Sequence, residues 1–545
     1  MKSFRTVIRQ LAFIIVPLLL TVPAAAQIPN TLLHSIPPTG PPQSGVQSGT
    51  AVAVGGGYVV VGAPFDDTDN VDAGAVQVFD VHSGALVQVL SNPGAGSNDQ
   101  FGGAVAISGT RIAVGAANAD AGATDAGMVY LFDLSSATPT VPVLTLTNPT
   151  PDTSDSYGVA VSMDGARVAV GAIRDDTAAT DAGAVYVYDL NSLTPATPVL
   201  SLFNPGPPEG DYFGFAVGLS GPLLVVGAVR DDVGGFNDAG SAYVYDHTNG
   251  TLIATLNNPD PALQDQFARV VAISGNRVVV GVWQDNNLGT DAGTVFVYDM
   301  GGASPDVPTV LLTNPGIAPN GFDNFGTSVA VSGARIVVGT WRDDVGETDA
   351  GCAYVFDVSG GTPTVPVATL NNPTPGLGDN FGRAVGFDGI YAVVGAHLDD
   401  DKALDMGTAW IYGPVDGDND GLRDLWEIAQ FGTTAGHGPL DDHDHDGYNE
   451  LLELGLGLTP TVSNPGGIPG MTQEGGYLTM TLTKQSGVAY EVQSAGSLLP
   501  ALPDSFSAGT TTVLIDNATT LKVRDNFLIS TAPGRFIHVK VTAAP

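Results

Sequence analysis

Two acidic stretches, beginning at residues 416 and 442, have the residue types and spacing of calcium-binding loops. The first reads DGDNDGLRDLWE, with aspartates at loop positions one, three and five, glycine at the sharp sixth position, and acids at nine and twelve. Its candidate ligands are Asp416, Asp418, Asp420, Leu422 (through its carbonyl), Asp424 and Glu427. The second stretch repeats the register with Asp442, Asp444, Asp446, Tyr448, Glu450 and Glu453. The tandem match predicts two sites for Ca²⁺, the one cofactor that we expect.

Each loop leads into a short helical pattern, over residues 425–431 and 449–454, so the pair is EF-hand-like. It resembles the dockerin and thrombospondin type 3-like calcium modules of secreted bacterial proteins. The 26-residue spacing and the short helices depart from a standard dockerin, so a cohesin partner is only one alternative. His443 and His445 stand at loop positions two and four, which leaves zinc as a minor alternative.

The chain before these loops repeats one phrase seven times, best seen at 325–357 as FGTSVAVSGARIVVGTWRDDVGETDAGCAYVFD. Its Asp-Ala-Gly element recurs every 53 to 58 residues, beginning at Asp72, Asp125, Asp181, Asp238, Asp291, Asp349 and, as Asp-Met-Gly, Asp405. A Val-Gly pair ends the second predicted strand at Gly62, Gly115, Gly171, Gly227, Gly281, Gly339 and Gly395. The opening aromatic stands at Phe101, Tyr157, Phe213, Phe267, Phe325 and Phe381, with Ser48 at the matching place in the first copy.

Each copy reads as four short strands, which in the second copy are 103–107, 111–115, 129–133 and 143–147. The Ser108-Gly109 turn supplies the positive φ of a tight hairpin, and the glycine after Asp-Ala predicts a close backbone approach. Radial repetition of short strands with this period predicts an all-β fold, a seven-bladed β-propeller.

The two ends of the repeat array complement each other. Residues 31–36 read like a fourth strand that precedes the first copy, whereas the last copy stops after its third strand at 408–412. We therefore expect the N-terminal strand to complete the seventh blade and to remove an open sheet edge.

The Phe-Gly openings and the Gly62-Ala63-Pro64 element resemble FG-GAP repeats, which build the seven-bladed head of integrin α subunits and many secreted bacterial propellers. In the integrin-type repeat, some blades insert an Asp-x-Asp-x-Asp-Gly calcium loop between their first and second strands. The corresponding turn here is as short as Ser108-Gly109-Thr110-Arg111, so the resemblance implies no calcium site on the blade hairpins.

Aspartates concentrate at one predicted face of the propeller, which receives the loop after each second strand and the loop that enters each first strand. The paired aspartates of that face begin at Asp66, Asp175, Asp231, Asp343 and Asp399. Another aspartate stands two positions before each aromatic, at Asp99, Asp155, Asp211, Asp265, Asp323 and Asp379. These carboxylates either cap turns or pool to bind Ca²⁺. The opposite face receives Arg111, Arg167, Arg277 and Arg335 and forms a mildly basic rim.

One position of the acidic face varies between blades. Trp283, Trp341 and His397 stand two residues after the strand-ending glycine of the last three copies. Aromatic platforms beside acidic loops suit carbohydrate stacking or a basic protein partner, and packing between blades is the alternative.

With 19 basic and 56 acidic residues, the net charge of −37 argues against nucleic acid and anionic membrane surfaces as partners. A basic segment, ten apolar residues and a small-residue cleavage site predict an export signal over 1–26 and a secreted or cell-surface protein without membrane insertion. The single cysteine, Cys352, occupies a position that is small in five of the six other copies and is methionine in the sixth, so we interpret it as a core residue.

The predicted organisation is the export signal (1–26), the propeller (27–413), the calcium module (414–460), a linker (461–474) and a small β-sandwich-like domain (475–545). The strands of that last domain are expected at 477–483, 489–493, 512–516, 520–524 and 536–542.

No nucleophile motif, phosphate loop or zinc-hydrolase helix occurs in the sequence, and its carboxylate pairs belong to the repeated scaffold. The leading interpretation is a non-catalytic protein that binds an extracellular protein or polysaccharide in adhesion or matrix attachment. The alternatives are a carbohydrate-active hydrolase or lyase that uses the acidic face, and a structural surface-layer component.

Overall fold

The structure is a computed structural model of the whole chain, and it describes residues 28–206, 209–286, 289–316 and 322–414 of the repeat region. It further describes 424–431, 438, 441, 443–445, 450, 453, 459–461, 470–474, 477–483, 488–495, 511–516, 520–528 and 536–543. The chain divides into two compact units, and the unit that contains the repeats ends at Pro414. The predicted export signal over 1–26 lies outside the described residues.

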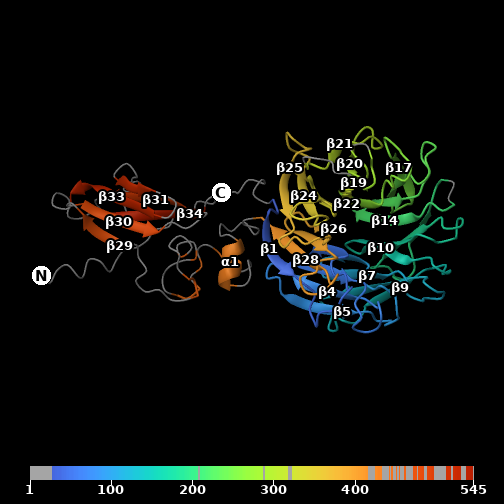
Figure 1. Cartoon of the computed structure of the whole chain (residues 1–545). Coiled ribbons are helices and arrows are strands. Elements are labelled where there is room, and N and C mark those ends of the chain that lie inside the picture. Colours follow the sequence, from blue (N-terminus) through green and yellow to red (C-terminus); the bar gives the residue numbers. More distant parts are fainter. Residues whose placement is uncertain are drawn as a thin grey trace. The chain divides into compact units, whose positions relative to one another are not determined.

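Seven four-stranded antiparallel sheets follow one another through the repeat region, as the sequence predicts (Figure 1). Blade one contains β2 (Ala51–Gly55), β3 (Tyr58–Ala63), β4 (Ala75–Asp80) and β5 (Leu86–Ser91). Blade two contains β6 (Ala104–Ser108), β7 (Arg111–Ala116), β8 (Met128–Asp133) and β9 (Leu144–Thr147). Blade three contains β10 (Tyr157–Asp164), β11 (Arg167–Ala172), β12 (Ala184–Asp189) and β13 (Leu200–Phe203). Blade four contains β14 (Phe213–Ser220), β15 (Leu223–Ala228), β16 (Ser241–Asp246) and β17 (Thr251–Asn257).

The remaining blades have the same construction. Blade five contains β18 (Val270–Ser274), β19 (Arg277–Val282), β20 (Thr294–Asp299) and β21 (Val310–Thr313). Blade six contains β22 (Phe325–Ser332), β23 (Arg335–Thr340), β24 (Cys352–Asp357) and β25 (Pro366–Asn371). Blade seven contains β26 (Phe381–Phe387), β27 (Ala392–Ala396), β28 (Thr408–Gly413) and β1 (Thr31–Ile36). The first strands of neighbouring blades contact one another, β2 touching both β6 and β26, so these strands surround the central channel.

The N-terminal strand closes the ring, which confirms the prediction. β1 pairs antiparallel with β28 as the outer strand of blade seven, with Ile36 opposite Ala409. Leu33 and Ile36 are buried in the core, whereas the neighbouring Leu32 is 36% exposed. The first and last parts of the repeat region therefore share one sheet, which leaves no unpaired edge on β28.

The glycines that mark the repeat lie where neighbouring blades touch. A Cβ atom on Gly171, at the end of a second strand, would stand 2.0 Å from the carbonyl oxygen of Gly214 in the next blade. Gly183 of the Asp-Ala-Gly element has a φ of +82°, and a Cβ there would meet the carbonyl oxygen of Phe213 at 2.1 Å. The same approaches recur around the ring, which confirms the close backbone contact expected after Asp-Ala.

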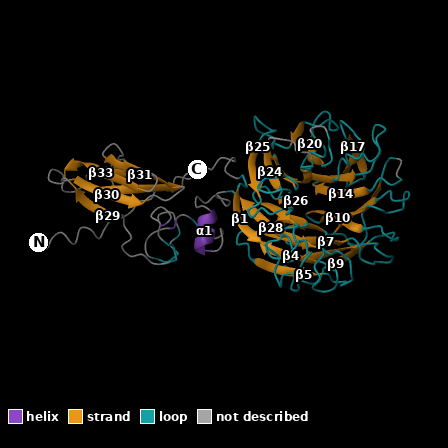
Figure 2. Cartoon of the chain, viewed as in Figure 1, coloured by secondary structure: helices purple, strands orange, loops and turns teal. Residues whose placement is uncertain are grey.

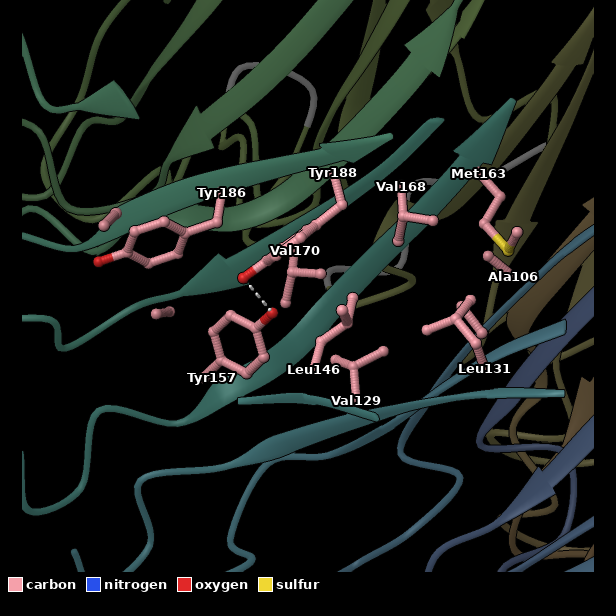
Figure 3. Close-up of a cluster of buried hydrophobic side chains, with 13 residues drawn as sticks. Ala106, Val129, Leu131, Leu146, Tyr157, Met163, Val168, Val170, Tyr186 and Tyr188 are labelled. Carbon is pink, nitrogen blue, oxygen red and sulfur yellow. Dashed lines mark hydrogen bonds between the residues drawn. The ribbon is translucent and has the colours of Figure 1, made fainter. Parts of the chain in front are cut away.

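Buried side chains fill the space between adjacent blades (Figure 3). Between blades two and three, Leu131 and Leu146 of one sheet belong to the same cluster as Val168 and Val170 of the next. The opening aromatic Tyr157 is fully buried there, and its hydroxyl donates a hydrogen bond of 2.8 Å to the hydroxyl of Tyr188. Cys352 is likewise a fully buried free thiol in the core between blades five and six.

The second unit contains helix α1 (Asp424–Phe431) within the predicted calcium module, and further strands (Figure 2). Strands β29 (Gly470–Glu474), β30 (Tyr477–Thr483), β33 (Thr520–Leu528) and β32 (Thr511–Asp516) form one sheet, and β31 (Val488–Ala495) pairs with β34 (Phe536–Ala543). The strands fall where the sequence predicts them, except that β29 lies within the stretch expected to be a linker. None of the helices that the structure describes is long and apolar enough to cross a membrane.

Candidate ligand site at the channel mouth

The acidic loops gather at one end of the propeller, which we call the loop face. It carries the loops between second and third strands and the loops that lead into first strands. These two loops of a blade are bonded together: the amide of Arg174 donates to the carbonyl of Asp155, and the amide of Arg230 donates to that of Asp211. The loop face is therefore a continuous surface of hydrogen-bonded turns around the channel.

The aspartates of the loop face have repeated structural partners. The carboxylate two positions before each aromatic accepts a hydrogen bond from an asparagine side chain at the end of the preceding fourth strand, as from Asn148 to Asp155 at 2.7 Å. The first aspartate of a pair accepts from a third-strand hydroxyl, as Asp175 does from Tyr186 at 2.6 Å. The second accepts the amide of the Asp-Ala-Gly aspartate, as Asp176 does from Asp181.

These bonds support turn capping, the first of the two alternatives, for the aspartates that accept them. In the described part of the loop face, moreover, no group of three or more His, Cys, Asp or Glu side chains is arranged to hold a metal ion. The positive charge of the opposite face is partly neutralised by ion pairs within 4.0 Å. The pairs are Arg111 with Asp133, Arg167 with Asp189, and Arg335 with Asp357.

The structure brings Trp283, Trp341 and His397 together beside the channel. The ring centroids of Trp283 and Trp341 are 6.1 Å apart, and those of Trp341 and His397 are 6.3 Å apart. The indole nitrogen of Trp283 donates to Gln266 and that of Trp341 to Asn324, which fixes the orientation of both rings. The three side chains form one aromatic row across blades five, six and seven.

Arginines cover this aromatic row, a feature that the sequence patterns above do not predict. The guanidinium of Arg269 lies 4.7 Å from the centroid of the Trp283 ring. Those of Arg342 and Arg383 lie 4.8 Å and 5.6 Å from the centroid of the Trp341 ring. At these distances a guanidinium is attracted to the face of an aromatic ring.

The same pattern continues in blades three and four, where Arg230 and Arg174 lie 4.2 Å and 5.7 Å from the ring centroid of Tyr212. None of the five arginines at the channel mouth forms an ion pair with any residue that the structure describes. The acidic loop face thus has a basic centre, which disfavours the basic protein partner suggested by the sequence.

A cavity of about 310 Å³ opens beside the arginines. Its lining residues are Gln47, Thr50, Pro64, Phe65, Gln100, Gly103, Ala104, Gly115, Ala117, Gly158, Val159, Arg383 and His397. The blades differ at one repeat position beside the cavity. Two residues after the strand-ending glycine, blades one and two carry Pro64 and Ala117 where blades five and six carry tryptophan.

Burial shifts the pKa values of His397 and of two arginines at the channel mouth. His397 is 8% exposed, and burial together with the charge of Arg383 lowers its pKa to about 3, so the imidazole is neutral. Burial and the charge of Arg383 lower the pKa of Arg269 to about 10, which still leaves it protonated at neutral pH. Burial also lowers the pKa of Arg383. Arg383 in the cavity, with Arg269 outside its lining over Trp283, is a poorly solvated cation beside a neutral imidazole, and this arrangement suits an anionic ligand.

The basic centre had a signal in the sequence. Arg269 and Arg383 stand two positions after the opening aromatic, whereas Arg174, Arg230 and Arg342 stand three positions after the strand-ending glycine. Each position has the same place in every copy of the repeat. Alignment of the seven copies at these two positions would have identified the arginines among the surrounding aspartates.

The predicted calcium ligands are described only in part. Asp416, Asp418, Asp420, Leu422, Asp442, Asp446 and Tyr448 lie outside the described residues, as does the side chain of Asp424. Glu427, Glu450 and Glu453, from positions nine and twelve of the loops, are fully buried, and Asp444 is half-buried. Carboxylate oxygens are the ligands that Ca²⁺ takes in proteins, so these three side chains remain candidate ligands. His443 and His445 are exposed, and the ring of His443 contacts Phe431 of α1.

Comparison with known proteins agrees with the architecture. The FG-GAP repeat family matches seven segments, at residues 42–79, 86–132, 143–188, 204–245, 251–298, 319–356 and 375–412. No curated protein matches the chain. The seven matches follow the seven blades and together cover more than half of the sequence, and the chain therefore belongs to the FG-GAP repeat family.

Proposed function

We propose that the chain is an exported, non-catalytic binding protein whose propeller is an interaction platform for an extracellular glycan or protein. The observation that carries the proposal is the asymmetry of the channel mouth. Two tryptophans, a histidine and three arginines stand over blades five to seven, beside an open cavity, and this combination is not repeated in the other blades. A scaffold that served only to fill space would have no need of such a departure.

The chemistry of the site favours binding over catalysis. The paired carboxylates of the loop face are occupied by the same turn bonds in several blades, and the one histidine at the mouth is buried and neutral. In the same proposal the tandem loops at 416–427 and 442–453 bind two Ca²⁺ ions and stabilise the module that follows the propeller. The buried carboxylates of Glu427, Glu450 and Glu453 support that assignment.

The experiment is a binding screen of the purified full chain against immobilised neutral glycans, acidic glycans and extracellular proteins, with calcium present. Saturable binding with no release of new reducing ends or unsaturated products supports the proposal. Binding to none of these classes would contradict it.

One observation favours a polysaccharide-cleaving enzyme as the second candidate. Burial and the neighbouring Asp231 raise the pKa of Asp211 to about 7, a value suited to a general acid. Product release from an acidic polysaccharide, lost in Asp211→Asn, would establish this alternative in place of the binding role.

A further inference from the structure

The cavity at the channel mouth is lined by a positively charged side chain, Arg383, that has no anionic partner among the described residues. Arg383 lies on β26 and is half-buried, and its guanidinium makes neither a hydrogen bond nor an ion pair with any residue that the structure describes. It lies over the face of Trp341, 5.6 Å from the ring centroid, and lines the cavity beside His397. A guanidinium in such surroundings keeps its five donors available for a bidentate oxyanion.

Other polar groups in the cavity are also available. The side-chain amides of Gln47 and Gln100 form no hydrogen bond within the described part of the chain, and both line the cavity with Arg383. The corresponding amides of blades five and six behave differently, because Gln266 and Asn324 hold the two indole rings. Nδ1 of His397 is buried and likewise makes no hydrogen bond with the described residues.

We propose that this cavity binds one acidic sugar residue of a glycan, with its carboxylate or sulfate group on Arg383 and its hydroxyl groups on Gln47 and Gln100. The proposal rests on the binding function proposed above and names its ligand class. Two amides offer donors and acceptors in equal measure, as sugar hydroxyl groups require, while a lone carboxylate needs donors only. The volume of about 310 Å³ is at the lower end of ligand pockets, which suits a single sugar unit or chain end.

Charge argues for the same ligand class. With a net charge of −37 and an aspartate-rich rim, the protein repels long polyanions such as nucleic acid. A chain end that presents one anionic group needs to approach only the basic centre. Arg269 and Arg342, stacked on the tryptophans, extend this centre toward the next sugar unit.

The test is calorimetric titration of the full chain, with calcium, using trigalacturonate, a sulfated galactose trisaccharide, neutral galactotriose and a hexa-aspartate peptide. We expect one site per chain for a charged trisaccharide and at least tenfold weaker binding of the neutral one. The carboxylated and sulfated ligands distinguish the two sources of the anion. Tighter binding of the peptide than of either charged sugar would overturn the assignment in favour of an acidic protein segment.

Two variants locate the site. Arg383→Gln should weaken binding of the charged trisaccharide at least tenfold. Arg277→Gln, at a partly exposed arginine of the opposite face, should leave it unchanged. Ala117→Trp copies into blade two the residue of blades five and six, fills the cavity without changing charge, and should abolish binding. Thermal melting of each variant shows whether it has folded.

The outcomes separate this inference from the broader function. If the chain binds neutral glycans in the wider screen and Arg383→Gln and Ala117→Trp leave that binding intact, the platform function stands and the acidic-sugar site is wrong. If no glycan or protein binds at all, both proposals are wrong.

Discussion

The side-chain amide of Asn148 donates a hydrogen bond of 2.7 Å to Oδ2 of Asp155, across the turn that joins blade two to blade three. Five further turns have the same pair, Asn92 with Asp99, Asn204 with Asp211, Asn258 with Asp265, Asn314 with Asp323, and Asn372 with Asp379. The repeat thus buries a carboxylate at each of six blade junctions, beside the aspartates of the neighbouring loop. Burial and this proximity make the propeller sensitive to pH.

Stability should fall as the pH rises from about 4 to 7. Desolvation raises the pKa of four carboxyl groups in the folded chain to values of about 6 to 7, namely Asp155, Asp211, Asp323 and Asp399. A group with a raised folded pKa stabilises the fold below its unfolded pKa, near 3.8, and loses that contribution as the pH rises through the folded value. Each group contributes on the order of 1 to 3 kcal/mol of this change. Urea denaturation at pH 4.5 and pH 8 measures it.

The matched variants for this prediction are Asp211→Asn and Asp246→Asn. Asp211→Asn keeps an acceptor for Asn204 but removes the charge, so it should stabilise the chain at pH 8 and flatten the pH profile. Hydrogen bonds from Thr248 lower the pKa of Asp246, and its replacement should destabilise the chain instead. A profile that Asp211→Asn leaves unchanged would show that general charge repulsion, not this buried carboxyl group, sets the pH dependence.

Closure of the ring by β1 can be tested with two substitutions on one strand. Ile36→Ala should lower the free energy of unfolding by about 2 to 5 kcal/mol, because Ile36 is buried in the core. Leu32→Ala, at a position that is 36% exposed, should cost less than about 1 kcal/mol. Equal costs in chemical denaturation would contradict the burial pattern of the closing strand.

The marker glycines should be intolerant of a methyl group. Gly171→Ala places a Cβ atom against the backbone of Gly214 in the next blade and should cost about 3 kcal/mol or more. Gly165→Ala is the control, since Gly165 occupies a hairpin with a φ of +58° and has nothing within 4 Å of the added atom. Its cost should be only the 1 to 2 kcal/mol or so of the left-handed backbone. Thermal unfolding of the two variants distinguishes steric conflict between blades from backbone strain.

Calcium binding should be confined to the module after the propeller. Calorimetry of the full chain should give about two ions, and Glu427→Gln and Glu453→Gln should each remove one, because each loses the bidentate ligand at loop position twelve. Glu347→Gln, in an exposed propeller loop, should leave both ions bound. Two ions retained by the double variant of Glu427 and Glu453 would move the sites to the aspartates of the loop face.

The fold was largely predictable from the sequence because each contact between blades requires particular residue types, which recur from copy to copy of the repeat. Gly171 and Gly183 recur in the repeat because the backbone of the next blade approaches them, and Tyr157 recurs because it is buried between two blades. The displaced fourth strand at residues 31–36 revealed how the ring closes. The sequence also placed Trp283, Trp341 and His397 on one face. It did not reveal what covers them.

The basic centre was harder to predict from the sequence, because its arginines are close together around the ring but far apart along the chain. Arg342 and Arg383 are 41 positions apart in the sequence yet stack on the same tryptophan. In the sequence, Arg342 directly precedes Asp343 and belongs to an acidic loop, so it does not stand out as basic. The folded loop directs the two side chains to different partners. The carboxylate of Asp343 accepts a hydrogen bond from the hydroxyl of Tyr354, while the guanidinium of Arg342 lies over Trp341.

The anion site at the channel mouth should be visible in the tryptophan fluorescence of the full chain titrated with trigalacturonate or with the sulfated galactose trisaccharide. Trp283 and Trp341 are half-buried and lie under the arginines of the site, whereas Trp410 is buried in blade seven. A saturable change with a charged trisaccharide, absent with galactotriose and lost in Arg383→Gln, is the predicted result. A signal that stays flat with both charged ligands, or that persists unchanged in Arg383→Gln, would contradict the account.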